Sequence, residues 1–224
     1  MLFFRVLKSS VSLVVVLIAA FCLSAQAQDT SAKDTETSGK QGMPPRASPT
    51  DYQAQGQVGP VTIAAEFTRH SVPTPESVYS TEDYVVVEAA LFGAPQSRLT
   101  ISAGDFSLRI NGKKKLLASQ PYALVAGSLK DPSWAPPTPT EKPKTSFGSG
   151  GQDAGSPPPV VHVPIGVTHA MDQHVEKAVM PEGDRVLPEA GLLFFEYRGK
   201  DKSIHSVELF YDGPAGKTKL ELRP

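Results

Sequence analysis

Residues 188–222 read PEAGLLFFEYRGKDKSIHSVELFYDGPAGKTKLEL, and this stretch decides the fold class. Over 206–211, Val207, Leu209 and Tyr211 share one face, and over 217–222, Thr218, Leu220 and Leu222 share one face, which is the period-two pattern of half-buried strands. The run at 192–197 is apolar on both faces, as expected for a central strand that is covered on both sides. Turn-forming residues at 198–201 and 212–214 separate the runs. The stretch therefore predicts an antiparallel meander, which a second sheet or a helix must cover.

The same period appears earlier in the chain. It predicts long strands at 61–68 and 84–92 and short strands at 99–103 and 106–110. Residues 71–80 contain two prolines and are expected to form a loop. The repeated short strands, without a strand–helix alternation, favour a single antiparallel β-sandwich.

A hairpin is expected directly after residue 110. Asn111 and Gly112 both favour the positive φ that a type I′ turn requires. The return strand would then carry Lys113, Lys114 and Lys115 on a solvent-facing edge, where lysines oppose pairing with other chains. A nucleic-acid patch is the alternative, but the net charge of −1 and the absence of interleaved aromatic residues argue against it. No nucleic-acid partner is expected.

Residues 1–27 have the three parts of a secretory signal peptide. Basic residues precede an apolar run at 11–21, which is too short to span a bilayer, and Ala25-Gln26-Ala27 forms a cleavage site. The mature chain is expected to begin at Gln28 and to be periplasmic or extracellular. It would contact the membrane only if the signal peptide stayed uncleaved. Cys22 is the one cysteine, so a mature chain would have no disulfide, zinc–thiolate site or cysteine nucleophile.

Two segments have low complexity. Residues 28–59 are polar, with almost no large apolar side chain, and are expected to be a disordered tether. Residues 131–159 alternate proline-rich and glycine-rich runs and are expected to be a long disordered insertion. A strand interrupted by Pro164 is expected at 160–167, and apolar residues at helical spacing predict one short helix over 168–180. The folded domain would then cover 60–224.

The chain contains no motif that indicates catalysis. It has no G-x-S-x-G, no H-E-x-x-H, no phosphate-binding glycine loop and no dinucleotide fingerprint. The run Gly148-Ser149-Gly150 lies inside the expected disordered insertion, without the strand–turn–helix context of a nucleophile elbow. We therefore expect a protein that is not an enzyme and that has no cofactor. A hydrolase or glycan-active protein, with a pocket between the sandwich and residues 121–181, is a further hypothesis.

A metal site has one set of candidate ligands, which consists of His169, Met171 and His174. Imidazole and thioether groups suit copper in an exported protein. On a helix, however, positions 169 and 174 do not share one face as residues three or four apart do. The alternative is that Met171 belongs to the core and that both histidines are solvated. A periplasmic copper-handling protein is therefore the alternative function.

Aromatic residues are the candidates for a binding surface. Trp134 precedes most of the proline-rich insertion, Tyr122 is near it in sequence, and Phe210 is expected on an outer sheet face. Exposed aromatic patches often mark protein or carbohydrate contacts. The alternative is that Trp134 holds the base of the insertion and that the helix covers Phe210.

The runs PEAG at 188–191, LLFF at 192–195 and IHSVELFY at 204–211 resemble the closing strands of immunoglobulin-like domains in uncharacterised exported bacterial proteins. The runs VVVEAALF at 85–92 and FSLRING at 106–112 resemble their earlier strands. The resemblance covers about 61–117 and 185–222 and consists mostly of strand periodicity. The insertion and the helix depart from a minimal domain of this kind.

The resemblance implies an immunoglobulin-like β-sandwich that acts as a non-catalytic envelope module, and it transfers no active-site residues. The favoured hypothesis is an exported module that binds or supports a protein partner in the cell envelope. Because the net charge is near zero, steering by charge would be weak, and an interface would depend on apolar and backbone contacts. Pairing of an edge strand with a partner's strand is one such contact.

Overall fold

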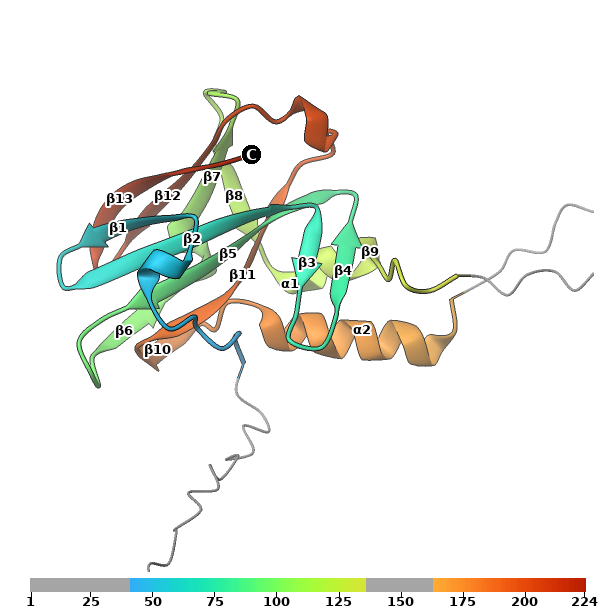
Figure 1. Ribbon diagram of the computed structural model, residues 1–224, viewed down its shortest axis with the longest axis horizontal. Helices are drawn as coiled ribbons and strands as arrows, with labels where there is room; N and C mark the ends of the chain where they lie inside the picture. Colours follow the sequence, from blue (N-terminus) through green and yellow to red (C-terminus); the bar gives the residue numbers. More distant parts are fainter. Residues whose placement is uncertain (1–40, 136–162) are drawn as a thin grey trace, which may run out of the picture. The chain divides into compact units, whose positions relative to one another are not determined.

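The computed structural model describes residues 41–135 and 163–224. The expected signal peptide at 1–27, residues 28–40 of the expected tether and residues 136–159 of the expected insertion lie outside the described residues. Within them the fold is mainly β, with antiparallel sheets and two α-helices (Figure 1). No helix in the described ranges is long and apolar enough to cross a bilayer.

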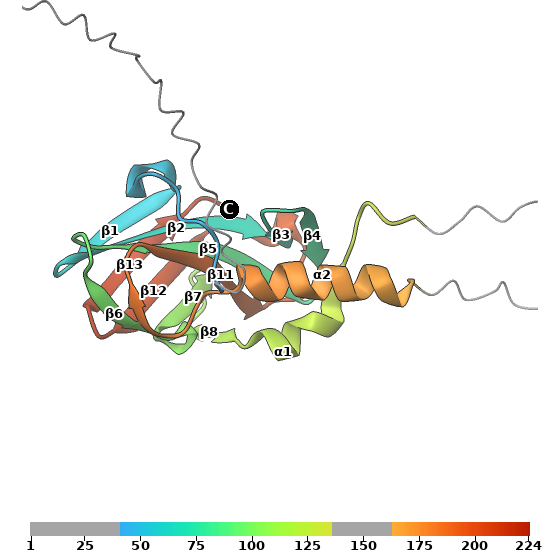
Figure 2. The ribbon, with the colours of Figure 1, turned by 90° about the horizontal axis from the view of Figure 1, so that it is seen from below.

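The main sheet has eight strands in the order β1-β2-β5-β11-β8-β7-β12-β13. In this order they are β1 (Ala54–Val58), β2 (Val61–Arg69), β5 (Tyr84–Phe92), β11 (Glu189–Glu196), β8 (Leu117–Gln120), β7 (Phe106–Ile110), β12 (Val207–Gly213) and β13 (Gly216–Leu222). The sheet curls until its first and last strands lie side by side (Figures 1 and 2). A Cβ on Gly56 of β1 would lie 2.8 Å from Cδ2 of Leu220 on β13. A β-sandwich architecture fits this arrangement.

Shorter elements cover the main sheet. A three-stranded sheet contains β3 (Ser71–Pro73), β4 (Val78–Thr81) and β9 (Leu129–Lys130), and a two-stranded sheet contains β6 (Arg98–Ile101) and β10 (Gly183–Val186). The α-helices are α1 (Tyr122–Val125) and α2 (Ile165–Ala178). Short 3₁₀ turns are η1 (Pro49–Asp51), η2 (Ala103–Asp105), η3 (Ala126–Ser128) and η4 (Asp201–Ser203).

The central strands β5 and β11 are buried on both faces. Alternate side chains, such as Val85 and Phe195, point into the curled sheet and join the larger apolar core. Those between them, such as Phe194, point outward and join a second core with Met171 and Val175 of α2. Helix α2 therefore covers the outer face of the sheet (Figure 2). The prediction of a central strand apolar on both faces is confirmed, because every β11 residue except Glu196 is buried.

The tether prediction is wrong for residues 41–59. Met43 forms a bridge with Ala190, and β1 pairs along its whole length with β2. Tyr52 is buried, with Phe92 edge-on to its ring at 6.0 Å between centroids. Backbone pairing to β2 and a few anchoring side chains order a segment whose composition is polar.

The prediction of a loop at 71–80 is wrong, because β3 and β4 form a hairpin there. Asn111 and Gly112 do adopt positive φ, 54° and 63°, as predicted. The three following lysines, however, do not lie on an edge strand. They lie in a connection, and β8 begins only at Leu117, between β11 and β7.

The predicted helix exists but starts earlier than expected. It begins at Ile165 rather than at residue 168, with Pro164 at its N-cap, so the strand expected over 160–167 is wrong where the structure describes it. Proline is tolerated at a helix start because the first N–H groups have no partner within the helix. The buried face consists of Met171, Val175 and Ala178. A second, single-turn helix, α1, occupies the segment before β9.

Candidate functional site

Trp134 lines a hollow of about 420 Å³ between the start of α2 and the segment that joins α1 to β9. Its walls are mostly apolar, and the side chains of Leu129, Val163, Val167 and Met171 contribute to them. Such a volume and lining are typical of sites that accept an apolar group. The structure thus places one of the sequence-predicted binding residues at a recess in the surface.

A turn after β9 positions Trp134. The Asp131 carboxylate accepts hydrogen bonds from the backbone N–H and the hydroxyl of Ser133, at 2.8 and 2.5 Å. The backbone N–H of Trp134 donates to the carbonyl of Asp131 at 3.2 Å. The hydrogen bond from the Ser133 hydroxyl lowers the pKa of Asp131. This turn directs the chain back toward α2, so the indole becomes part of the wall.

Tyr122 has a positioning role. Its hydroxyl lies 3.1 Å from both the carbonyl and the carboxylate of Asp172 on α2. Burial is the largest cause that raises the pKa of Tyr122, and the nearby Asp172 carboxylate is the next. The hydroxyl therefore stays protonated and donates its hydrogen bond to these oxygens. Tyr122 thereby fixes α1 against α2 and supports the rim of the hollow.

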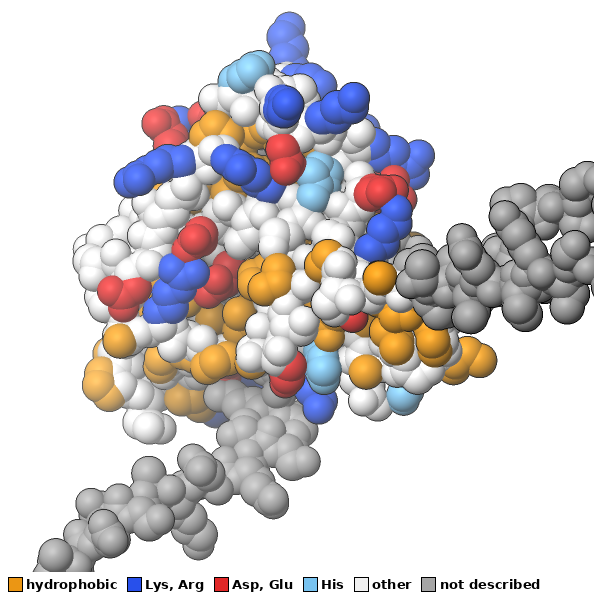
Figure 3. Space-filling view, turned by 45° about the vertical axis from the view of Figure 1, so that its right-hand side comes forward, with side chains coloured by type: hydrophobic (Ala, Val, Ile, Leu, Met, Phe, Trp, Pro, Cys, Tyr) orange, Lys and Arg blue, Asp and Glu red, His pale blue; other side chains and the backbone are white. Residues whose placement is uncertain are grey.

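Large apolar side chains are exposed beside this hollow. Ile165, the first residue of α2, is 88% exposed, and Val163 just before it is 42% exposed. Figure 3 shows hydrophobic side chains gathered at the end of the molecule where α2 begins. We call the set Trp134, Val163, Ile165 and Val167 the α2 apolar patch. It combines exposed side chains with a recess, as binding surfaces do.

Phe210 lies elsewhere, on the outer face of β12. The guanidinium carbon of Arg109 stands 4.7 Å from the centre of the Phe210 ring. Arg109 in turn pairs with Glu208 at 3.3 Å, and Lys219 pairs with the same carboxylate at 2.9 Å. The expectation that the helix covers Phe210 is wrong, since α2 covers Phe194 and Arg109 stacks on Phe210.

The three candidate copper ligands occupy different environments on α2. The Met171 side chain belongs to the outer core and is 6% exposed. His174 is half-buried, and its Nδ1 lies 2.7 Å from the hydroxyl of Tyr79. His169 is exposed, with its Nε2 3.0 Å from the Gln173 amide nitrogen. Among the described residues, no group of three His, Cys, Asp or Glu side chains is arranged to hold a metal ion. The copper hypothesis remains a prediction.

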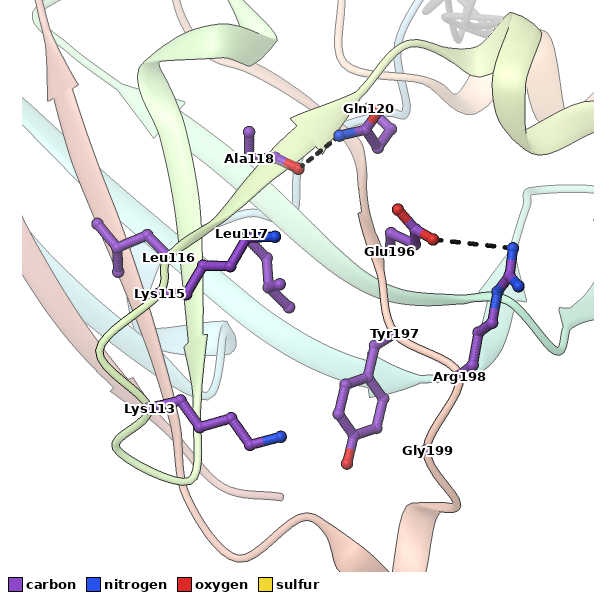
Figure 4. Close-up of a pocket in the computed structure, with 10 residues that line it drawn as sticks. All are labelled: Lys113, Lys115, Leu116, Leu117, Ala118, Gln120, Glu196, Tyr197, Arg198 and Gly199. Carbon is purple, nitrogen blue, oxygen red and sulfur yellow. Dashed lines mark hydrogen bonds and ion pairs between the residues drawn. The ribbon is translucent and has the colours of Figure 1, made fainter.

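A second hollow, of about 670 Å³, was missed by the sequence analysis (Figure 4). It opens between the chain entering β8 and the chain leaving β11. Lys113, Lys115 and Arg198 line it together with Leu117 and Tyr197. We call it the β8–β11 groove. Its residues come from 113–120 and 196–199, and the pairing of β8 with β11 brings these ranges together.

The described part of the chain therefore offers two recesses of different chemistry, one apolar and one lined by cations. Comparisons of the chain with protein-family models, with curated proteins and with solved structures found no match.

Proposed function

We propose that this protein is an exported, non-catalytic module that binds a protein partner in the cell envelope through the α2 apolar patch. One observation carries the proposal, namely the nearly full exposure of Ile165 beside the hollow that Trp134 lines. Burial of apolar surface contributes about 25 cal/mol per Å² to the free energy of binding. An apolar side chain of a partner would bury such surface both in the hollow and against Ile165. Tryptophan is also enriched among the residues that dominate binding energies at interfaces.

Export is supported by the signal-peptide pattern at 1–27. The immunoglobulin-like classification is part of the proposal, and the antiparallel sheets with both faces of the central strands covered support it. Binding is favoured over catalysis because the walls of the hollow are mostly apolar and few polar side chains line it. Of those that line it, Asp131 is engaged by Ser133, and the others are Lys130 and Thr168.

The experiment is site-specific photo-crosslinking in cells that export the full chain. A photoreactive amino acid replaces Ile165 in one variant and the exposed Thr100 of β6 in the control variant. We expect a recurrent adduct of one size from position 165 and none from position 100. In a chain that also carries Trp134→Ala, the adduct from position 165 should weaken severalfold while the far-ultraviolet circular dichroism spectrum stays unchanged.

Two results would refute the proposal. The first is equal capture at both positions, which would indicate contact by chance. The second is an adduct from position 165 that the Trp134→Ala change leaves at full strength, because the hollow would then contribute nothing to the interface.

A further inference from the structure

The β8–β11 groove lies at an opening in the main sheet. Strands β8 and β11 pair at only two positions, Phe194 with Gln120 and Phe195 with Ser119. Beyond Phe195 the two strands diverge, and the groove occupies the space between them. On its other side, β11 keeps its pairing with β5 as far as Glu196. At the junction each bank is a strand end that faces a gap, Leu117–Ala118 on one side and Glu196 on the other, although the Ala118 carbonyl already accepts a hydrogen bond from the Gln120 side-chain amide at 3.2 Å.

Cations gather around this opening. Lys113 and Lys115 are exposed on one bank, and Figure 4 shows Lys113 pointing toward Tyr197, with Arg198 on the opposite bank. Among the ion pairs of the described residues, neither lysine takes part, whereas Arg198 has Asp83 at 3.3 Å and Glu196 at 3.8 Å. The one acidic side chain among the residues that line the groove, Glu196, thus already forms an ion pair with Arg198.

Asn111 brings more lysines to the same end of the molecule. Its amide nitrogen donates to the carbonyl of Ser203 at 2.6 Å, and its amide oxygen accepts from the N–H of His205 at 2.7 Å. These hydrogen bonds hold the connection that carries Lys113 against η4. Lys202 lies within η4, and Lys200 directly precedes it. Figure 3 shows Lys and Arg side chains gathered at the end of the molecule opposite α2. A chain of net charge −1 therefore concentrates positive charge at one opening.

We propose that the β8–β11 groove binds an extended acidic segment of a protein partner, which pairs with the diverging banks of β8 and β11. The proposal rests on the proposed function only in taking the occupant to be a protein. Backbone pairing would supply affinity, as in strand addition at sheet edges. Lys113, Lys115 and Arg198 would select acidic side chains, while Leu117 and Tyr197 would contact the alternate side chains.

An anionic membrane surface is the other occupant that lysines suit, but the geometry favours a peptide. A bilayer surface contacts side chains that protrude, such as Lys200 and Lys202. It does not enter a recess between two strands, and it offers no backbone to pair with Glu196, which lines the groove. A peptide chain in the extended conformation fits such a recess. Its acidic side chains can pair with the groove cations, and its backbone can form hydrogen bonds with the strand ends.

The test measures binding of labelled peptides to the purified protein by fluorescence anisotropy. The probe is a short peptide of alternating glutamate and valine. Its lysine–valine analogue tests charge, and its backbone N-methylated form tests strand pairing. The variant K113Q/K115Q removes two groove cations, and the matched control K217Q/K219Q removes two cations on the outward face of β13. Vesicles of anionic and of neutral phospholipid are tested in parallel by co-sedimentation.

We expect the acidic peptide alone to bind, and N-methylation to abolish its binding. The K113Q/K115Q change should weaken binding about two- to thirtyfold, as the loss of two exposed charge pairs implies, and K217Q/K219Q should change it less than about twofold. Hydrogen exchange at residues 196–198 should slow when the peptide is added.

Three outcomes would overturn the inference. These are no binding of the acidic peptide, equal weakening by both double variants, or binding to anionic vesicles without binding to the peptide. If the photo-crosslink at position 165 persists while any of these is observed, the groove proposal fails and the proposed function stands. If the crosslink is lost and the peptide still binds with the expected selectivity, the reverse holds.

Discussion

Replacement of Arg46 by alanine tests how the segment before β1 is held. The Arg46 guanidinium pairs with Glu88 at 2.9 Å and with Glu66 at 2.5 Å, and it stands 4.5 Å from the centre of the Tyr52 ring. Glu88 lies in the middle of β5, and its side chain is only 6% exposed. In the variant Arg46→Ala, the Glu88 carboxylate would stay buried without its cation.

The magnitude follows from these exposures. Breaking a fully buried ion pair from one side costs about 3–5 kcal/mol. The Arg46 side chain is 34% exposed, so water reaches the site, and about 2 kcal/mol is the better figure for this term. Loss of the stacking on Tyr52 adds about 0.5–1 kcal/mol. We therefore expect Arg46→Ala to lower the free energy of unfolding by about 3 kcal/mol, which corresponds to a Tm lower by about 6–12 °C.

The assay is urea denaturation at pH 7, followed by circular dichroism. The control is Arg98→Ala, which breaks an exposed pair with Asp184 at 2.8 Å and should cost at most about 1 kcal/mol. The double variant Arg46→Ala, Glu88→Gln should recover part of the loss, because the unpaired charge is then gone. If Arg46→Ala stays within about 0.5 kcal/mol of Arg98→Ala, the reasoning about a buried charge is refuted.

Three further predictions concern single positions. Gly191→Ala should lower the free energy of unfolding by about 3 kcal/mol in urea, because a Cβ would lie 2.5 Å from the backbone nitrogen of Met180; a loss below about 1 kcal/mol contradicts this. Asn111→Ala should cost about 1–2 kcal/mol and speed amide exchange at His205, and unchanged exchange there argues against the bridge to η4. Glu208→Gln should destabilise the protein at pH 7, but the difference from the parent should shrink as the pH falls below 4.5. The hydrogen bond from Lys219 lowers the pKa of Glu208, so the stability that this carboxylate contributes is lost only as the pH falls through the lowered value; a difference that does not change with pH contradicts this.

Most strands of the main sheet, β1 and β8 excepted, were predictable because their pattern is local. Val207, Leu209 and Tyr211 lie at alternate positions on one face of their strand, and all three prove to be buried. The Asn111–Gly112 turn was predictable for the same reason, since the two residues determine their own φ angles. Where one face of a strand lies against the core, apolar residues at alternate positions in the sequence indicate which face it is.

The remaining features depend on partners that are distant in the sequence. Residues 41–58 are polar, and their order comes from β2, Glu88 and Ala190, none of which their composition can reveal. Trp134 was a candidate for a binding surface on its sequence position alone, whereas the α2 residues that line the hollow with it could not be foreseen from that position. The β8–β11 groove was missed because Lys113 and Arg198 each read as an ordinary turn or edge residue until the sheet brings them together.

The place of β11 in the sheet also bears on how the chain folds. By its pairing, strand β11 alone joins β1-β2-β5 to β8-β7-β12-β13. The two halves of the sheet therefore cannot pair until β11 has been synthesised, because Val85 of β5 pairs with Phe195 of β11. Contacts of such long sequence separation slow folding, because the loop must close before the pairing stabilises it. A nascent chain can pair β1, β2 and β5 with one another, but the edge of β5 that faces β11 would stay open until residue 196 has emerged. If the protein is exported, as we propose, this late closure of the sheet would help the chain to stay unfolded while it crosses a membrane.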